Sequence, residues 1–185
     1  MAKLVPQQHP ALHQTADLVP IGLITSPKIQ KVLKDMRTAL HSYNVAGFAG
    51  VAIAAPQIGV PLRIFLVEDM NPNRKEGEVV PSLVAINPEI VKMSKKKKIV
   101  GEGCLSVIDT YGAVSRSTQT TIRAYDAEGI VYQRGGSGLL AQIFQHEIDH
   151  LDGILFVDRA EKVWTGVEEK TARMAKKEKL KKKIL

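Results

Sequence analysis

The sequence predicts an α+β fold in which short strands surround a single helix that carries the chemistry of the molecule. Three observations support this prediction. Residues 137–153 combine helical periodicity with a metal-binding motif, residues 62–67 and 120–132 have the composition of strands, and an amphipathic helix is expected after residue 26. The chain shows no internal repeats, so these elements are expected to share one core.

The elements follow from local signals in chain order. Ser26-Pro27 is typical of a helix start, and residues 62–67 form an apolar strand that leads into a polar, turn-rich loop over 69–81. Short strands are expected at 84–86 and 89–91, and a hairpin at 120–125 and 130–132 around the turn signal Asp-Ala-Glu-Gly. In the first helix the apolar residues at helical spacing are Ile29, Val32, Leu33, Met36, Leu40 and Tyr43.

The second helix is expected to lie in the interior. Ser137 can serve as its N-cap, and Gly153 can end it in a left-handed conformation. Two adjacent stripes of the helix are expected to face the core, and these comprise Leu140, Phe144, Ile148 and Leu151, and Leu139, Ile143, His146 and His150. A buried pair of imidazoles needs polar partners, and a metal ion meets that need.

This helix carries the pattern H-E-x-x-H at residues 146–150. On a helix the pattern places His146 and His150 one turn apart, so that both imidazoles can bind one divalent metal. Glu147 would then lie beside the open position of the metal, where a bound water can lose a proton.

The third protein ligand decides the class of metal site, and the residues alone leave alternatives. A metzincin would need a third histidine, but Phe156 occupies that position. A thermolysin-type site would take Glu161, Glu168 or Glu169 from the charged segment that follows. The remaining candidate is Cys104, the only cysteine, which lies in Glu-Gly-Cys-Leu-Ser.

Three separated motifs resemble those of the peptide deformylases, metal-dependent hydrolases that remove the formyl group from new bacterial-type proteins. Residues 50–57 (GVAIAAPQ) are similar to the family's glycine-containing first motif, residues 102–106 (EGCLS) to its second, and residues 145–151 (QHEIDHL) to its third. The resemblance extends over about residues 20–160, and it implies the deformylase fold, with β-sheets packed around a central metal-binding helix.

The resemblance assigns roles to individual residues. It implies that Cys104, His146 and His150 hold the metal and that Glu147 acts as general base and then as general acid. The donors to the tetrahedral oxyanion would be the side-chain amide of Gln57 and the backbone N–H of Leu105. Glu102 and Asp149 are candidates for fixing the ligands.

The formyl-methionine substrate needs an apolar pocket beside the metal. Val51 is a candidate wall of this pocket, as are Leu139 and Ile143, which helical spacing places beside His146. The resemblance adds further residues expected to contact the peptide, and these are Gly50, Ala52, Gly103 and Arg116.

Two positions depart from the family pattern. Ala52 stands where the family has the second glycine of the first motif, and its methyl group could narrow the substrate groove. Ser115 stands where many members have proline, before the retained Arg116. The first departure concerns rate and substrate range, and neither concerns the metal ligands.

Ligands of this kind suit Fe²⁺, Zn²⁺, Ni²⁺ or Co²⁺, and the resemblance implies Fe²⁺ as the physiological metal. A single cysteine allows no internal disulfide, which fits the cytoplasm, and neither a signal peptide nor a membrane-spanning run is expected.

The chain has a formal net charge of +7, and much of the positive charge lies near the end. The expected organisation is one catalytic domain over 1–160 and a basic tail over 161–185, helical or disordered. The expected partners are N-formylmethionyl peptides and, through this tail, the ribosome, with no membrane and no sequence-specific nucleic acid. Lys95 to Lys98 form a second basic run.

Two other functions remain open at this point. A thermolysin-type metallopeptidase would not depend on Cys104, whereas a deformylase would lose its metal without it. A non-catalytic deformylase-like protein that binds metal or the ribosome would retain the ligands but show no turnover, and Ala52 makes this alternative worth testing.

Overall fold

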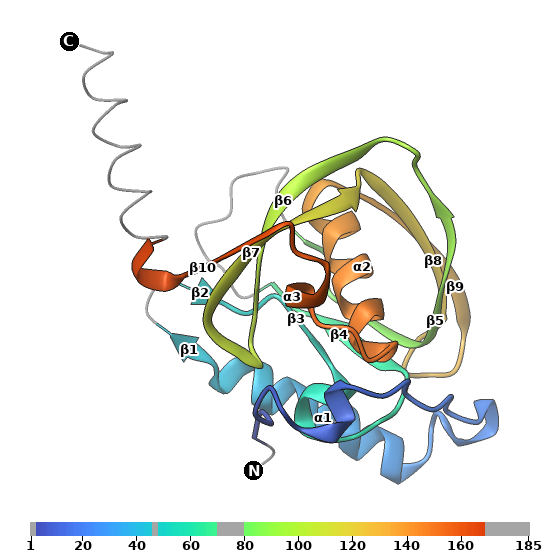
Figure 1. Ribbon diagram of the computed structural model, residues 1–185. Helices are drawn as coiled ribbons and strands as arrows, with labels where there is room; N and C mark the ends of the chain where they lie inside the picture. Colours follow the sequence, from blue (N-terminus) through green and yellow to red (C-terminus); the bar gives the residue numbers. More distant parts are fainter. Residues whose placement is uncertain (1–2, 46–47, 70–79, 169–185) are drawn as a thin grey trace.

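The computed structural model describes residues 3–45, 48–69 and 80–168 (Figure 1). The helices are the 3-10 helices η1 (Pro10–Leu12), η2 (Ile21–Leu23) and η3 (Ala55–Ile58) and the α-helices α1 (Pro27–Ser42), α2 (Gly138–Leu151) and α3 (Phe156–Arg159). The strands are β1 (Asn44–Val45), β2 (Phe48–Ala49), β3 (Ala52–Ala54), β4 (Ile64–Val67), β5 (Leu83–Met93), β6 (Lys97–Cys104), β7 (Val107–Ser117), β8 (Gln119–Tyr125), β9 (Val131–Ser137) and β10 (Lys162–Thr165).

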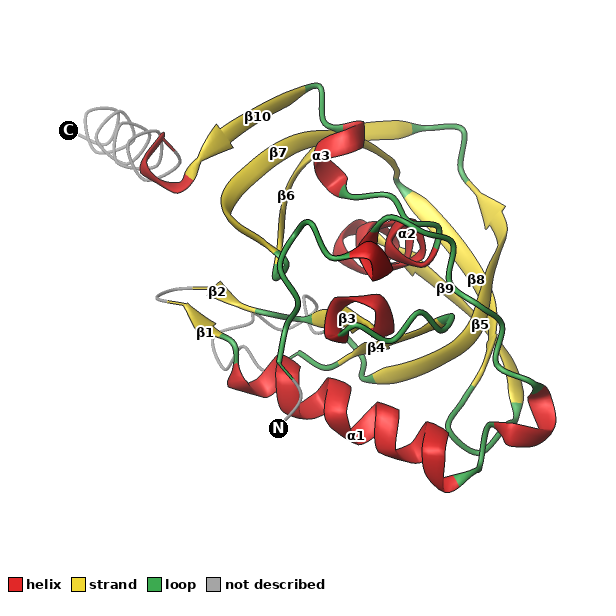
Figure 2. Cartoon of the chain, turned by 60° about the horizontal axis from the view of Figure 1, so that its bottom comes forward, coloured by secondary structure: helices red, strands yellow, loops and turns green. Residues whose placement is uncertain are grey.

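The strands form antiparallel sheets around α2. The larger sheet has the strand order β3-β4-β5-β8-β9, a three-stranded sheet has the order β10-β7-β6, and β1 pairs with β2. Figure 1 shows α2 enclosed by these strands, and Figure 2 shows α1 running along the opposite side of β3 and β4. The expected α+β architecture with a central helix is therefore confirmed.

Strand β4 separates two apolar cores, because all four of its residues are buried. Phe65 and Val67 pack with Phe144 and Ile143 on the α2 side, whereas the alternate residues of the strand face α1. A strand buried on both faces requires a continuous apolar run, and Ile-Phe-Leu-Val supplies it. Helix α2 thus packs against one face of the larger sheet, and α1 packs against the other face.

Both predicted helices are confirmed. The Ser26 hydroxyl accepts a hydrogen bond from the Ile29 N–H at 3.4 Å, as expected of an N-cap. At α2 the residue before the helix is Ser137, but its side chain makes no capping hydrogen bond. Gly153 follows the helix with a φ of 74°, so the predicted left-handed end is confirmed.

The strand predictions were correct but incomplete. The hairpin of β8 and β9 forms as expected, and the segments 84–86 and 89–91 belong to one strand, β5, which is interrupted at Asn87 with a φ of 52°. The β6–β7 hairpin was not predicted, nor was β10. Most of the predicted loop over 69–81 lies outside the described residues.

Strand β10 lies beyond the boundary predicted at residue 160. Its four residues pair with β7 from Ala113 to Thr110, which joins them to the domain. The remainder of the basic tail, from residue 169, lies outside the described residues. Within the described part of the chain, no helix is long and apolar enough to span a membrane.

Candidate metal centre and active site

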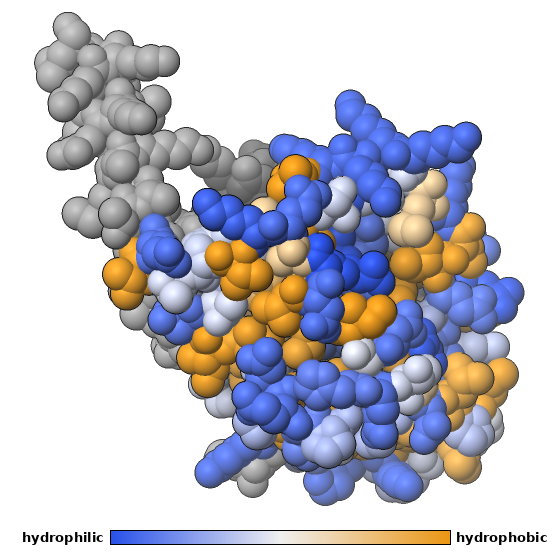
Figure 3. Space-filling model, in the orientation of Figure 1, coloured by the Kyte–Doolittle hydropathy of each residue, from blue (hydrophilic) through white to orange (hydrophobic). Residues whose placement is uncertain are grey.

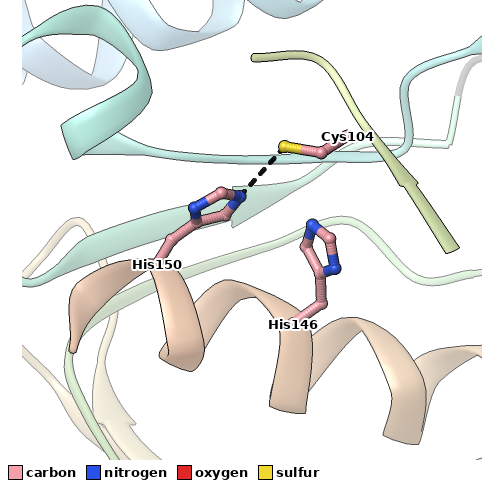
Figure 4. Close-up of side chains that lie close together, drawn as sticks. All are labelled: Cys104, His146 and His150. Atoms are coloured by element: carbon pink, nitrogen blue, oxygen red, sulfur yellow. Dashed lines mark hydrogen bonds between the residues drawn. The ribbon is translucent and has the colours of Figure 1, made fainter. Parts of the chain in front are cut away.

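Three side chains from two elements converge beside α2. Cys104 ends β6, while His146 and His150 lie one turn apart on α2, and their ligand atoms all lie within 4.8 Å of one another. Figure 4 shows both imidazoles projecting from the helix toward Cys104, whose Sγ lies 3.2 Å from His150 Nε2. The structure therefore brings together the three residues predicted to be metal ligands.

An irregularity in the β6–β7 hairpin determines where Cys104 lies. Gly103 pairs with Tyr111, but the next residue, Cys104, pairs with Val107, so the intervening residues of β7 bulge out of the ladder. Asp109, within this bulge, has a φ of 52°. Bulges redirect side chains beside functional sites, and this one places the thiol at the turn that faces α2.

The electrostatics of Cys104 suit a metal ligand. Burial would raise the pKa of its thiol, but the positive charge of His150 and hydrogen bonds with His146 and His150 lower this pKa to about 5. A thiol with such a pKa is a thiolate at neutral pH, and thiolate is the form that binds metals. One thiolate and two imidazoles fit a divalent transition metal, so the residues present are suited to hold one.

A buried ion network lies behind the ligands. Glu102 Oε2 accepts from His146 Nδ1 at 2.9 Å, so the Nε2 atom of this imidazole is left for a metal. Arg116 donates to both oxygens of Glu102, at 2.8 and 2.9 Å, and to Asp149 Oδ2 at 2.5 Å. Burial would raise the pKa of Glu102, but the hydrogen bonds from Arg116 and His146 lower it to about 2. Glu102 thus contacts the imidazole of His146 directly, and Asp149 is joined to Glu102 through Arg116, as expected of residues that fix the orientation of a ligand.

This network corrects the expectation that Arg116 contacts substrate. Its side chain is only 5% exposed, and Nε, Nη1 and Nη2 are all engaged by Glu102 and Asp149. The guanidinium group therefore has no free edge to offer a peptide, and it instead connects β6, β7 and α2.

Sequence reasoning missed two contributors from α3. Arg159 Nε lies 2.8 Å from Asp149 Oδ2, which extends the ion network toward the surface. The Phe156 ring stacks on the His146 imidazole, with centroids 6.3 Å apart and planes at 22°. Neither role has a local signal, because both depend on how the chain turns back after α2.

The predicted catalytic residues lie around the same centre. Gln57 is buried, its Oε1 accepts from the Ala54 N–H at 2.8 Å, and its Nε2 donates to Cys104 Sγ at 3.3 Å. Leu105 follows Cys104 in the two-residue turn between β6 and β7. Glu147 is buried on α2, and burial raises the pKa of its carboxyl group to about 7. Its Oε2 has no hydrogen-bond partner within the described residues.

The candidate substrate residues lie on α2, next to β3 and on β6. Ile143 is buried, and Leu139 and Val51 are partly buried against the same core. Gly50 allows a close approach, because a Cβ there would lie 2.8 Å from Leu40 Cδ1 and 3.1 Å from Leu105 Cδ2. Gly103, exposed on β6, would likewise bring a Cβ to 3.1 Å from the Tyr111 ring.

Ala52 does not present its methyl group to an open groove. It is 7% exposed and belongs to the apolar core on the α2 side, together with Ala54 and Phe65. The methyl group of Ala52, which the family's glycine lacks, therefore packs in this core.

The alternative third ligands receive no support. Glu161 and Glu168 are exposed, and among the described residues the cluster able to hold a metal consists of Cys104, His146 and His150. Glu169 lies outside the described residues.

Comparison with known proteins identifies what the chain is similar to. The family model described as "Polypeptide deformylase" matches residues 1–165. Peptide deformylase from Thermomicrobium roseum is 40% identical over 159 residues, covering 85% of each chain. That from Carboxydothermus hydrogenoformans is 41% identical over 161 residues, covering 87% of this chain and 94% of the relative.

Solved structures of similar proteins share the fold. Peptide deformylase from Thermotoga maritima matches with a TM-score of 0.74 at 27% identity, covering 88% of this chain and 99% of that chain. A class I type b peptide deformylase from Acinetobacter baumannii with Met-Ala-Ser bound matches with a TM-score of 0.76 at 31% identity, covering 84% and 96%.

Proposed function

The chain belongs to the polypeptide deformylase family, and we propose that it removes the N-terminal formyl group of newly made polypeptides at the site built on Cys104, His146 and His150. The observation that carries this proposal is the convergence of Cys104, His146 and His150, with the Glu147 carboxylate buried on α2 beside the two histidines. The family membership supports the proposed reaction, and the geometry supports the proposed roles of these residues.

Cys104, His146 and His150 would hold a divalent metal, which when bound supplies a water of lowered pKa and a positive charge beside the formyl oxygen. One thiolate with two imidazoles suits Fe²⁺, Zn²⁺, Ni²⁺ or Co²⁺, and Fe²⁺ is the metal we propose because the resemblance to the deformylases implies it. The reducing cytoplasm that we propose as the location would also preserve the thiolate of Cys104.

Glu147 moves the proton in the proposed reaction. Its carboxylate takes a proton from the attacking water as the water oxygen bonds to the formyl carbon. The bond from the formyl carbon to the amide nitrogen then breaks, and Glu147 returns the proton to the departing amine. A pKa near 7 suits a group that must both accept and donate a proton at neutral pH. The products are formate and the free amino terminus.

Gln57 and Leu105 would stabilise the negative charge that develops on the formyl oxygen. The Gln57 amide is held by its bond from the Ala54 N–H, so the NH₂ group points toward Cys104 before substrate arrives. Loss of one prepositioned donor of this kind typically raises the barrier by about 3–4 kcal/mol. Val51, Leu139 and Ile143 are the proposed walls of the methionine pocket.

The proposal is tested by formate release from formyl-Met-Ala-Ser, a peptide chosen because a similar structure contains bound Met-Ala-Ser. Protein purified without oxygen and loaded with Fe²⁺ or Ni²⁺ is compared with Glu147→Gln, which keeps the shape of the side chain but cannot move the proton. We expect robust release that is lost in the variant at equal metal content. Release that persists in Glu147→Gln would contradict the assigned role.

The basic tail is the proposed contact with the ribosome. Residues 161–185 contain nine Lys or Arg and four Glu, an excess of five positive charges. Deletion of residues 170–185 should weaken ribosome binding while activity on short peptides stays intact. Unchanged ribosome affinity at low salt would refute this contact.

A further inference from the structure

The turn between β5 and β6 carries a dense positive surface that the proposed reaction does not use. Residues 92–98 contain five lysines and no carboxylate, and all five lysines are exposed. None of them forms an ion pair within the part of the chain that the structure describes. Figure 3 shows long hydrophilic side chains over this end of the molecule. We name this surface, formed by Lys92, Lys95, Lys96, Lys97 and Lys98, the lysine turn.

Hydrogen bonds to the bend between β7 and β8 hold the lysine turn in place. The Lys96 carbonyl accepts from the Thr118 N–H at 3.0 Å and from the Ser94 hydroxyl at 2.9 Å. The Ser94 N–H in turn donates to the Gln119 carbonyl at 2.9 Å, and the Ser94 hydroxyl accepts from the Gln119 N–H at 3.1 Å. A partner would therefore meet charges on a backbone that is already ordered, which lowers the entropy lost on binding.

A hollow of about 370 Å³ opens beside Lys92 on the larger sheet. It forms where β9 has two glycines, and Gly135 lies opposite Thr121, which itself lies opposite Lys92. The described residues that line it include no carboxylate and no apolar side chain. They are Lys92, Ser94, Gln119, Thr121, Gly135, Gly136 and Ser137. Hydroxyl, amide and ammonium groups around a polar hollow are suited to binding phosphate oxygens.

We propose that the lysine turn and the adjacent hollow bind the sugar-phosphate backbone of RNA. Nucleic acids carry closely spaced phosphates, and a compact group of lysines that form no ion pair with the described residues can neutralise several of them at once. No aromatic side chain is among the described residues that line the hollow, so these residues offer bases no stacking platform and binding should depend little on RNA sequence.

The arrangement favours RNA over a membrane surface. Strand alternation places the exposed Met93 on the opposite face of β5 from Lys92, since Met93 pairs with the buried Thr120. The described residues that line the hollow beside Lys92 are polar, whereas a membrane-binding site usually combines basic residues with apolar side chains that enter the lipid.

The test compares two doubly substituted full-length proteins. Lys92→Glu with Lys96→Glu reverses two charges on the lysine turn, and Lys28→Glu with Lys34→Glu reverses two exposed charges on α1. Both variants have the same net charge and retain the basic tail. Binding of a fluorescein-labelled RNA hairpin is measured by anisotropy at several salt concentrations, and formate release is measured in parallel.

We expect the variant in the lysine turn to bind RNA at least about tenfold more weakly at low salt, and the slope of log K against log [salt] to fall by about 2. The α1 variant should bind nearly as the natural sequence does, and both should release formate normally. Equal RNA affinity of the two variants would overturn the proposal, because the contact would then lie elsewhere or reflect net charge alone. Tighter binding to phosphatidylserine vesicles than to RNA, lost in the lysine-turn variant, would overturn it in favour of a membrane.

Discussion

Replacement of Arg116 by methionine tests whether the buried ion network supports the metal centre. Methionine fills a similar volume but removes the three contacts of 2.5–2.9 Å that the guanidinium group makes with Glu102 and Asp149. The side chains of these carboxylates are 1% and 9% exposed, so they would lose the charge of Arg116 without gaining water, and only Asp149 would keep an arginine partner, Arg159. Breaking a buried pair in this way costs about 3–5 kcal/mol.

For a domain of this size, each kcal/mol corresponds to a shift of about 2–4 °C in Tm, so Arg116→Met should unfold about 6–20 °C below the natural sequence. Because Glu102 also orients His146, metal affinity should fall by about 10–100-fold. Thermal unfolding of the metal-free protein and competition with a chelator measure the two effects separately.

Arg123→Met is the matched control for this substitution. The Arg123 side chain is 52% exposed, and its Nη2 lies 3.6 Å from Glu89, so its replacement should change the free energy of unfolding by no more than about 0.5 kcal/mol. Glu102→Gln in the Arg116→Met background removes one of the stranded charges, so the two substitutions should cost less together than their separate costs added. Equal Tm values for Arg116→Met and Arg123→Met would refute the reasoning.

Three further predictions concern single positions. Ala52→Gly should lower the free energy of unfolding by about 1 kcal/mol and leave formate release from formyl-Met-Ala-Ser nearly unchanged, because the methyl group packs in the core; a large gain in kcat/KM would show instead that it narrows the groove. Gly153→Ala should lower the free energy of unfolding, measured in urea, by at least about 3 kcal/mol, because φ is 74° and a Cβ would lie 2.7 Å from the Gln14 backbone nitrogen. Gly138→Ala, where φ is 54° and a Cβ would meet open space, should lower it by only about 1–2 kcal/mol. Iodoacetamide should alkylate Cys104 rapidly at neutral pH in chelator-treated protein, because the lowered pKa of Cys104 makes it a reactive thiolate. After addition of Ni²⁺ the metal should bind this thiolate and slow the alkylation, which is followed by mass spectrometry. Equal rates with and without Ni²⁺ would argue against Cys104 as a ligand.

The parts of the fold that were predictable have local causes. Helix α1 begins where Ser26 caps it, and α2 ends where Gly153 adopts a positive φ, and both signals act within a few residues. The β6–β7 hairpin was not predictable in this way. Its connecting turn, Leu-Ser, has none of the glycine or asparagine that marks a tight hairpin, and its first strand is largely lysine, glycine and exposed positions.

The candidate site divides along the same line. His146 and His150 were predictable because helical geometry alone brings residues four apart to one side. Cys104 lies beside these histidines because of the bulge in β7, which depends on how β6 and β7 pair and has no local sequence signal. Its assignment as a ligand from the sequence therefore rested on the resemblance to the family. The true neighbours of Arg116 were not predictable, because an arginine beside a substrate and an arginine in an ion network look alike in a single sequence.

Helix α2 is fixed by two different kinds of interaction, and this bears on how the metal centre works. Apolar packing against β4 holds the side of the helix that carries Ile143 and Phe144, whereas charges hold His146 and Asp149 on another side. Apolar packing fixes the depth of a helix but is not directional, while the bidentate Arg116–Glu102 pair fixes the angle of the His146 ring. Changes in the network should therefore reduce the fraction of protein that holds metal, and the turnover of each metallated molecule should remain close to that of the natural sequence.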